Sequence, residues 1–206
     1  MIDFAATFIM FFAVVDPIGA VPVFVAVTRQ YDEAKKRRIA FVATGVAIVV
    51  LLFFVVAGEM ILRAMNIPIS AFRIAGGIIL FLFSLTMIIG ESHPEEDVAL
   101  DDEVSDNGNG TAIYPLAMPT LAGPGEILAA VLLTENDRYN IWEQVQTFFM
   151  LLAVLAVALV LMLLAGRIQR VIGSSGANVI SQIMGLILAA AAINNILVGI
   201  NEYFGL

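Results

Sequence analysis

Hydrophobic positions along the chain gather into six long segments separated by polar stretches. Four segments carry no charged residue and are long enough to cross roughly 30 Å of hydrocarbon as helices. They cover residues 39–57, 74–90, 147–166 and 177–200. The other two, residues 4–28 and 111–134, are long enough but are interrupted by prolines, glycines and one carboxylate each. The pattern predicts an all-α membrane protein in which the first and fourth of six membrane segments are broken.

An interrupted segment opens each half of the chain, which suggests an internal repeat. At an offset of 106 residues, "DPIG" (16–19) aligns with "AGPG" (122–125), and at an offset of 108 Gly77 aligns with Gly185. Few residues are identical in this alignment. The evidence for a repeat is therefore the order of the segments, one broken and two whole, in each half of the chain. Three membrane segments per half place the halves in opposite orientations, so we expect two inverted 3+3 repeats.

Composition agrees with membrane insertion and isolates one polar segment. Hydrophobic residues make up 61% of the 206 positions and charged residues 14%, with a mean hydropathy of +0.97. In soluble domains, hydrophobic residues make up closer to half of the positions and charged residues closer to a quarter. The net charge of −8 comes from residues 91–110, which hold eight acidic residues and no Lys or Arg. Low hydrophobicity and high charge predict a disordered acidic linker there, between membrane repeats at 1–90 and 111–206.

The distribution of Lys and Arg predicts the orientation, because cytoplasmic loops are enriched in them. The loop at 29–38 holds five of the ten basic residues. With both termini outside, seven basic residues fall in cytoplasmic loops and three in outer loops. We therefore expect a multi-pass protein of the inner (cytoplasmic) membrane with termini outside and the acidic linker inside. Arg73, at the start of the third segment, is expected to snorkel to the interface.

Several function classes lack their usual residues. The chain has no cysteine, its single histidine, His93, lies in the linker, and neither GxSxG nor HExxH occurs. We therefore expect no enzyme, catalytic residue, metal site or cofactor, apart from a coupling H+ or Na+. No basic patch with interleaved aromatic residues suggests nucleic acid.

The interruptions indicate a cavity. Proline removes a backbone donor, and in hydrocarbon a broken helix persists only where the break is buried in protein or faces water. Helices that restart after Gly19 and Gly125 would aim two N-termini, which attract anions, at the middle of the membrane. Asp16 would add a fixed negative charge. Such a place suits a zwitterion, its carboxylate at the helix N-termini and its ammonium at Asp16.

Each candidate also has a purely structural interpretation. Kinked helices can pack through small residues, and Glu126 can simply occupy the first turn of a restarted helix. A carboxylate at a helix centre costs roughly 2.5–3.5 kcal/mol, which favours a cavity for Asp16. Asn194 and Asn195 can bond between helices, and we expect one in packing and one toward the cavity. Thr86 is aligned with Asn194 by the offset of 108.

The candidate substrate site comprises residues of the two interrupted segments and three polar residues of later segments. They are Asp16, Pro17, Gly19, Ala20, Pro22, Thr120, Ala122, Gly123, Pro124, Gly125, Glu126, Thr86, Asn194 and Asn195. Either Asp16 or Glu126 could carry a coupling proton.

The two motifs "VVDPIGAVPVF" and "PLAMPTLAGPGEI" resemble those of the MarC family of bacterial and archaeal inner-membrane proteins, which includes the SnatA small neutral amino acid transporters. The matching positions are Asp16, Pro17, Gly19, Pro22, Pro115, Leu116, Ala117, Pro119, Ala122, Gly123, Pro124 and Gly125. The resemblance covers essentially the whole chain. It implies a six-span secondary transporter of glycine, alanine and similar amino acids, driven by a cation gradient. Ala20 departs from the Asn of many relatives, which removes a possible side-chain hydrogen bond.

The function expected is thus cation-coupled transport of a small zwitterionic solute by alternating access between the repeats. A channel or facilitator, an exporter of another small polar solute, and an intramembrane enzyme or structural protein are the alternatives. The partners expected are that solute and the lipid bilayer, and a homo-oligomer is compatible with the sequence.

Overall fold

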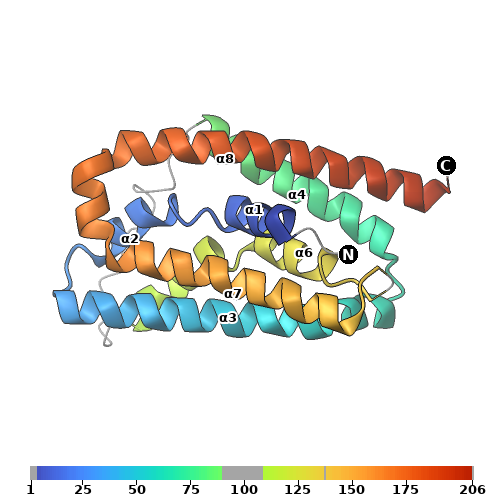
Figure 1. Ribbon diagram of the computed structural model, residues 1–206, viewed down its shortest axis with the longest axis horizontal. Coiled ribbons are helices and arrows are strands. Elements are labelled where there is room, and N and C mark those ends of the chain that lie inside the picture. The colour runs from blue at the N-terminus through green and yellow to red at the C-terminus, as the bar shows by residue number, and fades with distance from the viewer. Residues whose placement is uncertain (1–3, 90–108, 137, 206) are drawn as a thin grey trace.

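The computed structural model describes residues 4–89, 109–136 and 138–205, and every regular element in these ranges is helical (Figure 1). The elements are α1 (Phe4–Val15), α2 (Ala20–Thr28), α3 (Glu33–Ala64), α4 (Ile69–Ile89), α5 (Asn109–Thr111), η1 (Ala112–Leu121), α6 (Pro124–Leu132), α7 (Ile141–Leu163) and α8 (Ala165–Phe204). Most of the predicted acidic linker lies outside the described residues, and its last two positions, 109 and 110, already belong to α5.

Five helical stretches are long and apolar enough to cross a membrane when α1 and α2 are counted together as Phe4–Thr28. The pair η1 and α6, bent by 50° at its junction, makes a sixth if it is counted as one span. The chain is therefore a multi-pass integral membrane protein.

The helices form three layers along the long axis (Figure 1). The helices α3 and α7 pack together on one side, and α4 and α8 pack together on the other. Between them lie α1, α2 and α6, and the α2–α8, α4–α6, α1–α7 and α3–η1 contacts join the layers. The start of α1, the α3–α4 turn and the end of α8 lie toward one end of the molecule, and the α2–α3 and α7–α8 connections lie at the other.

Helix boundaries follow local chemistry. Asp32 precedes α3 and accepts the Lys35 backbone N–H at 2.7 Å, and Asn140 and Glu143 form a capping box at the start of α7. These side chains satisfy backbone donors that a helix start leaves free. The bend in α8 falls at Gly173, whose φ of 67° lies in the left-handed region that glycine adopts without steric penalty. The first turns of α8 can therefore run across the molecule before the long part of the helix returns along it (Figure 1).

Charged residues tie the molecule together at the end where α8 finishes. Arg73 of α4 is only 2% exposed, and its guanidinium donates to Glu135 at 2.7 Å and to Glu202 at 3.1 Å. Nearby, Glu59 accepts the backbone and side-chain N–H groups of Asn136 at 2.8 and 2.7 Å. The expectation that Arg73 snorkels to the interface is therefore wrong, because two carboxylates far along the chain hold it inside.

Candidate functional site

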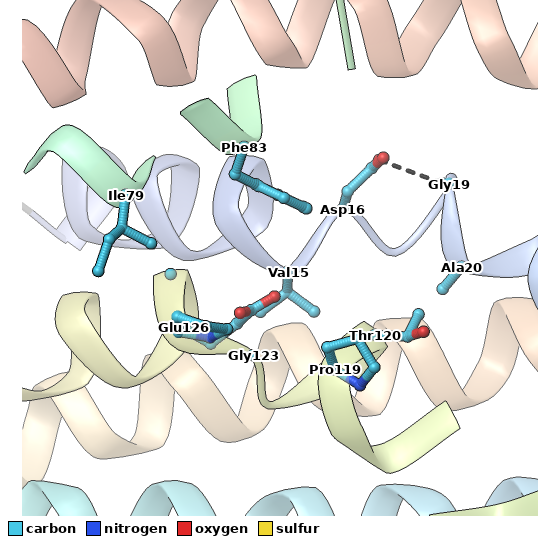
Figure 2. A pocket seen from close by; sticks show the side chains of 12 residues that line it. Val15, Asp16, Gly19, Ala20, Ile79, Phe83, Pro119, Thr120, Gly123 and Glu126 are labelled. Atoms are coloured by element: carbon cyan, nitrogen blue, oxygen red, sulfur yellow. Dashed lines mark hydrogen bonds between the residues drawn. The ribbon is translucent and has the colours of Figure 1, made fainter. Parts of the chain in front are cut away.

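A cavity of about 220 Å³ lies where the α1–α2 junction (residues 16–19) faces the η1–α6 junction (residues 122–123). Its lining residues come from these junctions, their flanking helices and α4 (Figure 2): Val15, Asp16, Gly19, Ala20, Ile79, Phe83, Pro119, Thr120, Gly123, Pro124, Gly125 and Glu126. Eight of the fourteen residues predicted from the sequence are among them. The structure therefore brings together two motifs that lie about a hundred residues apart.

Asp16 is held in place from two directions. Asp16 is only 5% exposed. Its Oδ1 accepts the Gly19 backbone N–H at 3.1 Å, and its Oδ2 accepts the Ser181 hydroxyl of α8 at 2.8 Å. Its φ of 41° is in the left-handed region, which Asp tolerates better than most residues. The Asp16 carboxylate thus caps the start of α2, through the bond to Gly19 marked in Figure 2, and its bond to Ser181 joins the α1–α2 junction to α8.

Gly19 is required by this arrangement. A Cβ at position 19 would overlap the Asp16 carboxylate and lie 2.8 Å from Ser181 Oγ. Ser181 itself was missed in the sequence. It is one hydroxyl near the start of a long apolar segment, 165 residues away from Asp16, and no local signal distinguishes it from a serine that bonds its own helix.

Glu126 lies in the first turn of α6 and also lines the cavity. Gly123 is the N-cap and Pro124 opens the helix, so the restart falls two residues before the point expected from the sequence. Glu126 is 3% exposed, and its carboxylate lies beside Gly123 at the start of α6. A Cβ on Gly123 would lie only 2.9 Å from Glu126 Oε2 and 2.6 Å from the Pro119 carbonyl oxygen, so glycine is required here too.

The cavity has an acidic part and an apolar part. Asp16 and Glu126 are close enough for their carboxylates to interact electrostatically, and the described lining residues include no Lys, Arg or His. Ile79 and Phe83 of α4 point toward the opening between the junctions (Figure 2). The site therefore suits a small solute that carries a positive group.

Six predicted residues do not line this cavity in the described part of the chain. Pro17 and Ala122 are buried within the junctions, and Pro22 is half-buried in α2. Thr86 is exposed and donates to the Phe83 carbonyl at 2.7 Å.

Neither of the paired asparagines contributes to the cavity, although one of them was expected to do so. Asn194 is exposed and Asn195 is half-buried. The buried face of α8 carries Ser181, Leu188 and Ala192. Asn194 lies two residues beyond Ala192, about 200° around the helix from that face.

The fold and this site define a class: a multi-pass α-helical membrane protein with a small acidic cavity between two helix junctions. A family model described as MarC family integral membrane protein matches residues 1–204, and the chain belongs to that family.

Relatives of similar length support this assignment. The chain is 32% identical to a UPF0056 membrane protein of Aquifex aeolicus over 97% of this chain and 92% of the relative. It is 33% identical to a UPF0056 membrane protein of Methanocaldococcus jannaschii, over 96% of this chain and 95% of the relative. It is also 32% identical to the UPF0056 membrane protein YhcE of Escherichia coli, over 96% and 91%. No solved structure matches the chain.

Proposed function

We propose that the protein is a secondary transporter of small neutral amino acids of the size of glycine or alanine, coupled to a cation gradient. The observation that carries the proposal is the cavity of about 220 Å³, which two helix junctions from different halves of the chain form together. A cavity enclosed by one half alone could not change its access when the halves move relative to each other.

Contacts between α4 and α8 support an inverted repeat. A Cβ on Gly77 of α4 would meet Cγ1 of Ile196 at 2.7 Å and the carbonyl oxygen of Ala192 at 3.0 Å. A Cβ on Gly185 of α8 would meet Cγ1 of Ile88 at 3.1 Å and the carbonyl oxygen of Ser84 at 3.2 Å. The offset of 108 residues relates the members of the two sets: Gly77 to Gly185, Ala192 to Ser84 and Ile196 to Ile88. Such reciprocity is what a two-fold axis between α4 and α8 produces.

The packing of the other elements follows the same relation. The contact of α2 with α8 corresponds to that of α6 with α4, and the contact of α1 with α7 corresponds to that of η1 with α3. Thr28 and Thr134, at the ends of α2 and α6, each donate at 2.6 Å to the carbonyl four residues earlier. We infer that each half contributes one broken and two whole segments.

Alternating access needs contacts that hold one end of the molecule closed. Arg73 lies in the first half of the chain, whereas its partners Glu135 and Glu202 lie in the second. In the described conformation these ion pairs join the halves at the end where α8 finishes. That end is extracellular in the orientation we propose, with the termini outside the inner membrane and the acidic linker in the cytoplasm. Opening there would require the Arg73 contacts to separate.

The chemistry of the cavity favours a substrate with an ammonium group. Two buried carboxylates without a basic lining residue attract a cation, and the small volume excludes large side chains. Glycine and alanine supply an ammonium next to a carboxylate in a molecule that fits. The coupling ion would be H+ or Na+.

The test is uptake of labelled glycine and alanine into proteoliposomes, with imposed proton or sodium gradients. Saturable uptake that rises with one gradient supports the transporter. In Asp16→Asn, uptake should fall about tenfold or more, because a buried charge partner of the ammonium is lost. Glu33→Gln, which alters an exposed carboxylate at the start of α3, is the matched control and should leave uptake unchanged. Flux that does not saturate would indicate a channel or facilitator, and absence of flux in folded protein would contradict the proposal.

A further inference from the structure

Both helix starts at the cavity are already occupied by acidic side chains of the chain itself. Asp16 accepts the Gly19 N–H before α2 at 3.1 Å, and the Glu126 carboxylate lies against Gly123, the N-cap of α6, where a Cβ would come within 2.9 Å of its Oε2. A substrate carboxylate needs donors of this kind, because helix N-termini are where a buried anion is best stabilised. It can bind at one of them only if the resident carboxylate leaves.

The two resident carboxylates are held differently. Asp16 has a backbone donor on its own junction and the Ser181 hydroxyl on α8, so its release requires a rearrangement between helices. Glu126 Oε2 lies beside Gly123 of its own helix start, and no hydrogen bond among the described residues joins Glu126 to another helix. Rotation of its side chain alone is enough to uncover the start of α6, so Glu126 is the exchangeable group.

Charge decides when this exchange takes place. The helices α1, α3 and α4 pack against α6, and Asp16, at the end of α1, is the titratable residue that the described lining places beside Glu126. A substrate carboxylate next to a charged Glu126 would add a third negative charge to a cavity without a basic lining residue. A protonated Glu126 is neutral, and a neutral carboxyl competes less than a carboxylate for the backbone N–H groups at the start of α6.

We propose that Glu126 binds the coupling proton, and that protonation opens the start of α6 at Gly123 as the subsite for the substrate carboxylate while Asp16 stays charged and receives the ammonium. The inference rests on the proposed transport function and names its coupling ion and both halves of its substrate site. One proton passes from the aqueous phase to the Glu126 carboxylate for each substrate bound, and returns to water on the other side. The zwitterion and the proton together bring one positive charge to the two carboxylates.

The first measurement is proton uptake on binding. Calorimetric titration of the purified protein with glycine, in buffers of different ionisation enthalpy, should give an observed enthalpy that depends on the buffer and corresponds to one proton taken up. The apparent affinity for glycine should fall about tenfold for each pH unit above the titration of Glu126. Binding without proton uptake would overturn the proposal, and because the wild-type protein is used, this result does not depend on how any variant folds.

The second measurement compares variants in proteoliposomes. In Glu126→Gln, a proton gradient should no longer drive accumulation of glycine, and the remaining exchange of glycine across the membrane should no longer depend on pH. In Asp16→Asn, both driven uptake and exchange should be lost. Glu33→Gln should behave as wild type. Accumulation driven by sodium and not by protons would overturn the role of Glu126 but leave the transporter standing, whereas no saturable uptake under any gradient would overturn the proposed function itself.

Discussion

Replacement of Arg73 by glutamine tests whether the ion pairs at the end of α8 hold the two halves of the chain together. Arg73 makes two charge-assisted hydrogen bonds, to Glu135 and Glu202, and its guanidinium has almost no contact with solvent. Each bond of this kind contributes about 1.5–3 kcal/mol. Removal of one member of a buried pair destabilises proteins by about 3–5 kcal/mol, because the remaining charge stays buried.

Two details place the expected value at the lower end of that range. Arg138 pairs with the same two carboxylates, so Arg73→Gln does not leave them without a cation. Within the described part of the chain, Arg73 Nε is buried without a hydrogen-bond partner, so some desolvation cost is already present in the wild type. We therefore expect Arg73→Gln to destabilise the protein by about 3 kcal/mol. For a chain of this length the midpoint of thermal unfolding should fall by about 6–12 °C.

This shift is measured by thermal unfolding in detergent, with size-exclusion chromatography as the readout. Lys36→Gln is the matched control, since Lys36 pairs with Glu33 one helical turn away and the Glu33 side chain is 83% exposed. Exposed pairs contribute about 0–1 kcal/mol, so its midpoint should change little. A double-mutant cycle of Arg73→Gln with Glu135→Gln should give a coupling of more than about 1 kcal/mol. Equal shifts in Arg73→Gln and Lys36→Gln, or no coupling in the cycle, would refute the reasoning.

Three further changes probe packing, the site and the orientation. Gly185→Leu should destabilise the protein by about 1–3 kcal/mol, because any Cβ at position 185 already lies 2.9 Å from Cβ of Met87 in α4. Gly45→Ala is the control in the same thermal assay and should not reduce stability, because a Cβ there has no atom within 4 Å. Gly19→Ala should lower glycine uptake by displacing the neighbouring carboxylate from its serine partner, and unaltered uptake would contradict that geometry. The chain has no cysteine, so single cysteines report orientation: a membrane-impermeant maleimide applied to intact cells should label Met65→Cys but not Gln30→Cys, and the opposite pattern would reverse the proposed orientation.

The sequence predicted those features that depend on neighbouring residues. Long apolar segments predicted the membrane helices, and the density of proline and glycine around Asp16 and Gly123 marked the residues that line the cavity. Both signals are local, because they reflect how a short stretch of backbone can satisfy its own hydrogen bonds in hydrocarbon.

Features that depend on distant partners could not be predicted. The Arg73 side chain is buried because its two carboxylate partners lie 62 and 129 residues away, and an isolated segment contains neither. Asn194 was expected near the cavity or in packing, but its face of α8 depends on how the helix turns after the bend at Gly173. Ser181 contacts Asp16 only because α8 returns alongside α2. In each case, the tertiary packing decided which way a helix face points.

The Asp16 cap at the start of α2 allows a structural role to be distinguished from a functional one. Asparagine caps a helix start about as well as aspartate does, so capping alone gives no reason for a charge at position 16. A carboxylate at the middle of a membrane segment costs roughly 2.5–3.5 kcal/mol, which a neutral cap avoids. We therefore expect Asp16→Asn to retain the fold and to unfold at the same temperature as the wild type or a higher one, while glycine uptake is lost. A parallel loss of stability and uptake would instead mean that the Asp16 carboxylate serves the fold, and the charge in the cavity would then need another explanation.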